Sequence, residues 1–116
     1  MTTKLRGETK PMQPRIPRDL RERVSAAVPG HGYTATSVAI SALMAYLDEP
    51  TDLARLRAAR EVRFPMRLPA SLHEAVVARA AADTAVLQAA AGGSPVTAVT
   101  RSDVVVAALS AALTRA

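Results

Sequence analysis

The fold is predicted by an eight-residue stretch in the middle of the chain, Val62-Arg63-Phe64-Pro65-Met66-Arg67-Leu68-Pro69. Apolar side chains occupy every second position of this stretch, and Arg63 and Arg67 lie between them. Because successive side chains of a strand point to opposite faces, the alternation predicts an extended strand with one apolar and one cationic face. Helical spacing of apolar residues then begins directly after Pro69, a residue type that is favoured at the first turn of a helix.

The same pattern occurs once before, in the segment Met12-Gln13-Pro14-Arg15-Ile16-Pro17. Arg15-Ile16-Pro17 matches Arg67-Leu68-Pro69, and the apolar helix positions Leu20 and Val24 match Leu72 and Val76 at the same offset. Each copy then continues into a second, almost wholly apolar segment, 38–47 or 104–113. The chain is therefore predicted to have the order strand–helix–helix twice.

Four helices are expected from this pattern, at about 17–28, from Thr34 or Thr36 to residue 47, at about 70–91, and from Thr100 to residue 113. A side-chain oxygen of Thr34 or Thr36 can cap the second helix. Thr100 followed by Asp103 resembles a capping box at the start of the last one. The segments 38–47 and 104–113 are apolar on all sides, so we expect each to be covered by the other.

The predicted fold class is mainly α with a short two-stranded antiparallel β-ribbon. Residues 1–10 are expected to form a flexible basic arm, and residues 11–116 one domain made of two repeats, 11–47 and 62–116. A partly helical linker, 48–61, joins them, with a short helix expected over 53–60. Extended chain covers up to about 3.3 Å per residue, so this linker can bring the second strand back beside the first.

Composition excludes several classes of site. None of the 116 residues is cysteine, which excludes disulfides, thiolate metal ligands and a cysteine nucleophile. The chain shows no glycine-rich phosphate loop and no nucleophile with a base at a suitable spacing, so an enzyme is not expected. The histidines, His31 and His73, lack acidic or thiol partners at ligand spacing, so no metal is expected. No apolar run is long enough to span a bilayer, and we expect a cytoplasmic protein with no membrane partner, cofactor or small-molecule ligand.

The net charge of +5 and the sequence pI of about 10.7 come from two basic clusters. One lies between Met1 and Val24, and the other is Arg55, Arg57, Arg60, Arg63 and Arg67. Such clusters attract polyanions, and nucleic acid is the first candidate. A solvated arginine-rich surface is the alternative interpretation.

Together, these motifs resemble the ribbon–helix–helix DNA-binding family, to which the Arc and Met repressors belong. The resemblance is carried by the strands ending in Arg-Ile-Pro or Arg-Leu-Pro, by the leucine three residues later, and by Thr100-Arg101-Ser102-Asp103. It covers residues 11–47 and 62–113. In this family two copies pair their strands into a ribbon that enters the DNA major groove. Here both copies lie on one chain, so the resemblance implies a tandem, single-chain version.

The resemblance implies two sets of DNA contacts. Outward residues of the ribbon would contact base edges, namely Gln13, Arg15, Arg63 and Arg67. Phosphates would be held by the starts of the second helices and by the basic arm, namely Lys4, Arg6, Lys10, Thr34, Thr36, Thr100, Arg101 and Ser102.

Two prolines depart from the family pattern. Pro14 and Pro65 lie at opposite parity in their strands, so at least one hydrogen bond of the ladder should be absent. Pro65 also occupies a position where family members carry a base-contacting side chain. An asymmetric DNA site is therefore expected.

The expected function is sequence-specific binding of double-stranded DNA, most often by a transcriptional repressor, with a nucleoid-associated location and possible self-association on DNA. Plasmid partition and relaxosome assembly are alternative roles of the same fold. A helical protein–protein adaptor that does not bind DNA is the alternative from another class.

Overall fold

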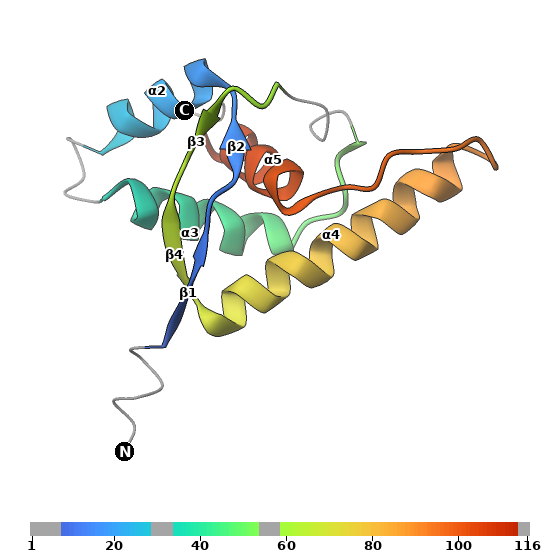
Figure 1. The fold of residues 1–116 in the computed structure, drawn as a ribbon, viewed down its shortest axis with the longest axis horizontal. Helices are drawn as coiled ribbons and strands as arrows, with labels where there is room; N and C mark the ends of the chain where they lie inside the picture. Colours follow the sequence, from blue (N-terminus) through green and yellow to red (C-terminus); the bar gives the residue numbers. More distant parts are fainter. Residues whose placement is uncertain (1–7, 29–33, 54–58, 114–116) are drawn as a thin grey trace.

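The computed structural model describes residues 8–28, 34–53 and 59–113. Its elements follow the order β1 (Thr9–Met12), β2 (Arg15–Ile16), α2 (Arg18–Ala27), α3 (Ala35–Leu47), β3 (Val62–Arg63), β4 (Met66–Pro69), α4 (Ala70–Ala90) and α5 (Arg101–Leu113). The protein is thus mainly helical with a small antiparallel β component, and the order strand–helix–helix occurs twice (Figure 1). None of the helices described has the length and hydropathy that crossing a membrane requires.

Two segments, 9–16 and 62–69, form what we call the ribbon. β1 pairs with β4 so that Met12 lies opposite Met66, and β2 pairs with β3 so that Arg15 lies opposite Arg63. The same antiparallel register continues across the residues in between, which places Gln13 opposite Pro65. Alternate side chains of both segments are buried: Met12, Pro14, Ile16, Phe64, Met66 and Leu68. The alternation predicted from the sequence is confirmed.

The prolines of the ribbon determine where its hydrogen-bond ladder is incomplete. Phe64 N–H donates to Pro14 O at 2.9 Å, and Ala70 N–H donates to Glu8 O at 3.3 Å. Even-numbered residues of the first segment therefore occupy hydrogen-bonded positions. Pro14 has no N–H to return to Phe64, whereas the nitrogen of Pro65 faces away from the other strand. The ladder is interrupted at this point into two short sheets, as the opposite parity of the two prolines predicts.

Helices α2 and α4 leave the ribbon at its opposite ends (Figure 1). Each begins directly after a proline, Pro17 or Pro69, as expected. The first N–H of α2, on Arg18, donates to Glu61 Oε1 at 2.8 Å. A carboxylate from the last residue of the linker thus occupies the N-terminus of a helix in the first copy, where the helix dipole favours it. The buried positions are Leu20 and Val24 in α2, and Leu72, Val76, Ala80 and Asp83 in α4.

The starts of α3 and α5 are capped by nearby side chains. Thr34 Oγ1 accepts a hydrogen bond from Ser37 N–H at 3.1 Å, so Thr34 is the cap, and Thr36 lies in the first turn. Before α5, Asp103 Oδ2 accepts from Thr100 N–H at 2.9 Å, and Thr100 Oγ1 accepts from Asp103 N–H at 3.3 Å. This reciprocal pair confirms the predicted capping box.

The two apolar helices, α3 and α5, pack against each other beneath the ribbon. Leu43 of α3 and Leu109 of α5 are both fully buried. All residues from 103 to 109 are buried, which makes α5 the most enclosed of the helices described. The buried residues of both copies belong to one hydrophobic cluster, so each copy supplies part of the core of the other.

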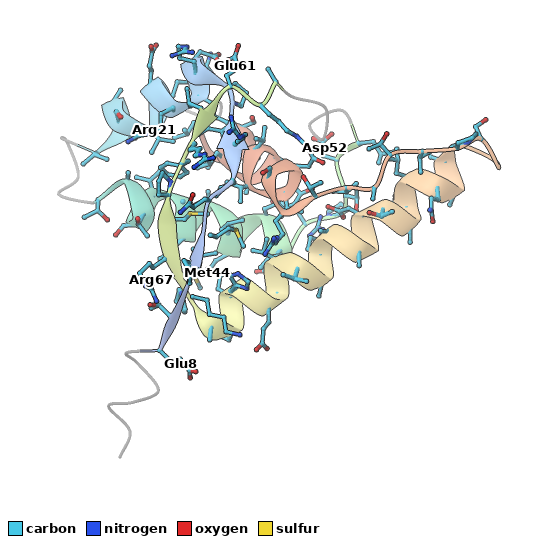
Figure 2. The ribbon with its side chains drawn as sticks, in the orientation of Figure 1. Glu8, Arg21, Met44, Asp52, Glu61 and Arg67 are labelled. Atoms are coloured by element: carbon cyan, nitrogen blue, oxygen red, sulfur yellow. The ribbon has the colours of Figure 1, made fainter. Side chains whose placement is uncertain are left out.

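Helix α3 is covered on several sides and exposed on one. Met44 exposes 59% of its surface, and Ser41 and Ala45 are exposed beside it. Figure 2 shows Met44 projecting from α3. The expectation that the other apolar helix covers the run 38–47 is confirmed, because α5 packs against α3, but the side that carries Met44 remains exposed. Helices α2, α4 and α5 and strand β4 contact α3.

A buried polar cluster, formed by Arg79, Asp83, Tyr46 and Thr51, joins α4 to α3 and to the start of the linker. Arg79 Nε donates to Asp83 Oδ1 at 2.7 Å, and Asp83 is completely buried. The hydroxyls of Tyr46, at 3.3 Å, and of Thr51 also donate to the Asp83 carboxylate. Arg79 Nη1 donates to Tyr46 O at 3.0 Å. Burial and then the negative charge of Asp83 raise the pKa of Tyr46, which keeps its hydroxyl protonated as a donor.

The first strand begins earlier than the sequence predicts. β1 starts at Thr9, so Lys10 lies in the ribbon opposite Leu68 and not in a flexible arm that extends to residue 10. Backbone pairing continues to Glu8, whose carbonyl accepts a hydrogen bond from Ala70 N–H. The polar segment 8–10 is therefore held by backbone hydrogen bonds of the ribbon. The remainder of the expected arm, residues 1–7, lies outside the described residues.

The helix expected at 53–60 falls mostly outside the described residues, which exclude 54–58. The described residues at its C-terminal end, Ala59 and Arg60, have no helical structure. His31 also lies outside the described residues.

Because both strands of the ribbon come from one chain, we expect the melting temperature to be independent of protein concentration. Thermal denaturation over a hundredfold range of concentration checks this expectation. A melting temperature that rises steadily with concentration would instead indicate that the strands are exchanged between two chains.

Candidate nucleic-acid interface

Between positions 11 and 15 of the first segment and 63 and 67 of the second, six side chains project from the ribbon away from the core. These are Pro11, Gln13, Arg15, Arg63, Pro65 and Arg67, all of them exposed, and we call them the outward face. The structure therefore brings the four side chains expected to contact bases, two from each copy, onto one surface.

One end of the outward face is strongly cationic. Arg15 lies directly opposite Arg63, at a position between hydrogen-bonded pairs. Cα atoms at such positions are only about 4.5 Å apart. Like charges directly opposite each other destabilise a sheet, and a bound anion would relieve the repulsion between them.

The other end carries one arginine. Arg67 lies opposite Pro11, and its guanidinium is hydrogen-bonded to Thr9. Between the two ends, Gln13 lies opposite Pro65. The two strands therefore present different groups at equivalent positions, so the outward face has no twofold symmetry.

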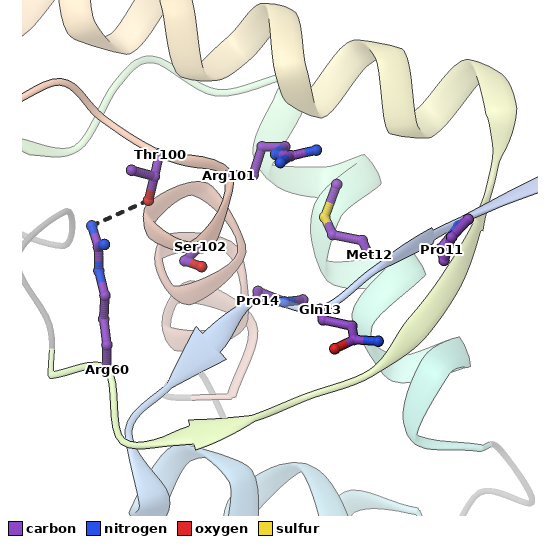
Figure 3. Close-up of a pocket in the computed structure, with 8 residues that line it drawn as sticks. All are labelled: Pro11, Met12, Gln13, Pro14, Arg60, Thr100, Arg101 and Ser102. Carbon is purple, nitrogen blue, oxygen red and sulfur yellow. Dashed lines mark hydrogen bonds between the residues drawn. The ribbon is translucent and has the colours of Figure 1, made fainter.

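The start of α5 is attached to the ribbon. Arg15 N–H, which faces away from the paired strand, donates to Ser102 Oγ at 3.1 Å. A hollow of about 240 Å³ lies between the ribbon and this helix start (Figure 3). Its lining consists of Pro11, Met12, Gln13, Pro14, Arg60, Thr100, Arg101 and Ser102. Three of the residues expected to hold a phosphate, Thr100, Arg101 and Ser102, thus meet beside the outward face.

Arg60 is a member of this hollow that the sequence did not single out. Its Nη2 donates to Thr100 Oγ1 at 3.2 Å and lies 3.2 Å from both carboxylate oxygens of Asp103. The side chain remains 46% exposed. Arg60 belongs to the second basic cluster in the sequence, but only the pairing of the ribbon brings the end of the linker to the first turn of α5.

The start of α3 lies beside the other end of the outward face. A hollow of about 400 Å³ is lined there by Pro11, Gln13, Thr36, Pro65, Met66 and Arg67. Thr36 is therefore close to the ribbon, whereas Thr34 is exposed and its hydroxyl caps the helix. The α3 side presents neutral hydroxyls, while the α5 side presents two arginines.

Of the remaining residues expected to hold phosphates, Lys4 and Arg6 lie outside the described residues. Lys10 is exposed at the end of the ribbon. In the part of the chain that the structure describes, no group of three or more histidine, aspartate or glutamate side chains could hold a metal ion.

Comparison with protein-family models, with curated proteins and with solved structures finds no match to this chain.

Proposed function

We propose that this protein binds specific sites on double-stranded DNA as a tandem ribbon–helix–helix protein, with both copies supplied by one chain. The observation that carries the proposal is the exposed outward face of the ribbon, with its three arginines and one glutamine, flanked by the starts of α3 and α5. A role in transcription regulation, most often repression, follows from the family resemblance, with a nucleoid-associated location.

The dimensions and chemistry of the ribbon support this proposal. The major groove is about 12 Å wide and admits a two-stranded ribbon. Arginine pairs well with O6 and N7 of guanine, and glutamine with adenine. Arg15, Arg63 and Arg67 would therefore contact guanines, and Gln13 an adenine near the centre of the site.

The flanking helix starts support a second set of contacts, to the DNA backbone. A helix N-terminus favours an anion through its free N–H groups and its dipole. At α5 this would be reinforced by Arg60 and Arg101, and at α3 by the hydroxyl of Thr36. Contacts of this kind position a protein on the duplex without selecting a sequence.

Several roles use the same surface. Repression, plasmid partition and relaxosome assembly all require the site-specific binding proposed here. One ribbon contacts only a few base pairs, so neighbouring molecules would associate on a longer site. A protein–protein adaptor would leave the arginines as solubilising groups and would not require DNA.

The test begins with a duplex selected by the full-length protein from a random pool. Arg15→Ala is expected to weaken binding to this duplex by about 1–3 kcal/mol and to relax the base preference at one position. Folding should be unaffected because the side chain is exposed. The matched control is Arg23→Ala, which removes the same charge from the exposed surface of α2.

Titration at two salt concentrations by fluorescence anisotropy separates the alternatives. A DNA-binding protein should lose affinity steeply as the salt concentration rises, because releasing counterions from the DNA then contributes less free energy to binding. Lys10→Ala should weaken binding to selected and scrambled duplexes alike. Absence of salt-dependent binding would favour the adaptor, and full specificity in Arg15→Ala, Arg63→Ala and Arg67→Ala would refute base contacts by the ribbon.

A further inference from the structure

We infer that Thr9 is a positioning residue for Arg67, which it holds in the orientation needed to contact a guanine. This inference rests on the proposed function, since it concerns how one of the proposed base contacts is prepared before DNA is bound. It assigns different roles to the three arginines of the outward face.

The hydrogen bonds of Arg67 leave a defined part of its guanidinium free. Nε donates to Thr9 Oγ1 at 2.9 Å, and Nη2 donates to Thr9 O at 3.1 Å. A guanidinium has five N–H groups in a rigid plane, and these two bonds use the edge formed by Nε and Nη2. The end of the group, formed by Nη1 and the second N–H of Nη2, remains available. This pair of donors matches O6 and N7 of guanine.

The backbone explains why Thr9 can serve as the acceptor. Thr9 lies opposite Pro69, at a position between the hydrogen-bonded pairs of Glu8 with Ala70 and of Lys10 with Leu68. The carbonyl at such a position faces away from the paired strand and is not used by the ladder. Thr9 is on the same face of the ribbon as Arg67, so its hydroxyl and carbonyl are both within reach of this side chain.

Within the described ranges, the residue that corresponds to Thr9 by the repeat offset is not hydrogen-bonded to an arginine side chain of the outward face; it caps a helix. This residue is Glu61, and the arginine that matches Arg67 is Arg15. The Glu61 carboxylate accepts the Arg18 N–H at 2.8 Å and so caps α2. Among the described residues, no side-chain hydrogen bond or ion pair is found for Arg15 or Arg63. Arg67 is thus the one outward arginine that the described residues hold in place.

A held side chain loses less conformational entropy when it binds, and its geometry penalises a wrong base more strongly. We therefore expect Arg67 to discriminate more sharply than Arg15 or Arg63, and Thr9 to be responsible for part of this discrimination.

The test compares Thr9→Val, which keeps the shape and removes the hydroxyl, with Thr9→Ser, which keeps the hydroxyl. Both are made in the full-length chain, and affinity is measured for the selected duplex and for variants changed at single base pairs. Arg67→Ala identifies the base pair that Arg67 contacts. Thr9→Val should reduce discrimination at that base pair by roughly two- to tenfold, the effect of one hydrogen bond. Thr9→Ser should retain it, and discrimination at other base pairs should not change.

An NMR measurement without DNA provides a second test. The Nε–H signal of Arg67 should be protected from solvent exchange in the unmodified protein and in Thr9→Ser, and should exchange faster in Thr9→Val. The melting temperatures of the variants should agree, because valine suits a strand and Thr9 is only half-buried.

The outcomes distinguish the inference from the proposed function. If Arg67→Ala loses a base preference while Thr9→Val keeps it, the positioning role is refuted and DNA recognition by the ribbon stands. Equal exchange of the Arg67 Nε–H in all three proteins also refutes the positioning role. If Arg67→Ala itself keeps every base preference, the base contact proposed for Arg67 is refuted, and the role of Thr9 with it.

Discussion

Replacing Asp83 with alanine is expected to lower the free energy of unfolding by about 3–5 kcal/mol, as for other buried ion pairs that lose one partner. Asp83 is completely buried and accepts hydrogen bonds from Arg79, Tyr46 and Thr51. Its removal would leave the largely buried Arg79 guanidinium without a counter-charge. Arg79 Nη2 is already buried without a hydrogen-bond partner among the described residues. Urea denaturation followed by circular dichroism measures the change.

Two further variants show whether charge burial is the cause. Glu74→Ala removes an exposed carboxylate from the same helix and should change stability by less than about 0.5 kcal/mol. The double variant Arg79→Met with Asp83→Leu should be less destabilised than Asp83→Ala alone, because hydrophobic residues often replace a buried pair without loss. A loss below about 1 kcal/mol in Asp83→Ala would contradict a structural role for the buried polar cluster.

The second large effect is expected in the core, where Leu109→Ala should cost about 2–5 kcal/mol. Leu109 is fully buried in α5, the most enclosed of the helices described, and the core around it includes residues of both copies. A cavity at this position therefore removes contacts between the copies as well as within one of them. Thermal or urea unfolding gives the magnitude, and a single cooperative transition is expected, because the two copies share one hydrophobic cluster.

Met44→Ala is the matched control for the core prediction. Met44 is also a large apolar residue of an apolar helix, but 59% of its surface is exposed. Its replacement should change stability by no more than about 0.5 kcal/mol. If Met44→Ala costs as much as Leu109→Ala, then the exposed side of α3 is covered in solution.

Because both strand–helix–helix copies lie on one chain, the two halves of the proposed interface can carry different residues, which is impossible in a symmetric dimer. In a dimer of identical chains every residue of the interface occurs twice, so both halves must be equal. Here the matching positions hold different residues, such as Thr9 and Glu61, or Gln13 and Pro65. One strand can therefore hold an arginine in place while the other caps a helix, and the DNA site proposed for this protein would be asymmetric.

Several features of the fold could be predicted from single residues and their spacing. The alternation around Phe64 and Met66 predicted which face of the strand is buried, because side-chain direction has a period of two along any strand. The alternatives Thr34 and Thr36 predicted the start of α3 to within two residues, and the pair Thr100 and Asp103 predicted the start of α5, because capping is local. The opposite parity of Pro14 and Pro65 predicted an interrupted ladder, because the N–H groups of a strand also alternate in direction with a period of two.

Other features depend on residues far apart in the sequence. Arg79 and Asp83 are neighbours on one helix, but nothing in their spacing indicates that Tyr46 and Thr51 complete a buried cluster around them. Arg60 reaches the start of α5, and Thr9 reaches Arg67, only because the ribbon pairs in one particular register. The apolar sequence of α3 predicted that the other apolar helix covers it, but it did not indicate which side, the one with Met44, remains exposed.

The sequence by itself thus determined the order of the strands and helices, the helix starts and the buried face of the ribbon, since these follow from periodicity and from capping within a few residues. The tertiary structure decided which polar groups meet, which arginine of the outward face is held and which side of α3 stays open. These outcomes depend on how the two copies pack, and a pattern of apolar and polar positions specifies that a surface must be covered without specifying by which residues.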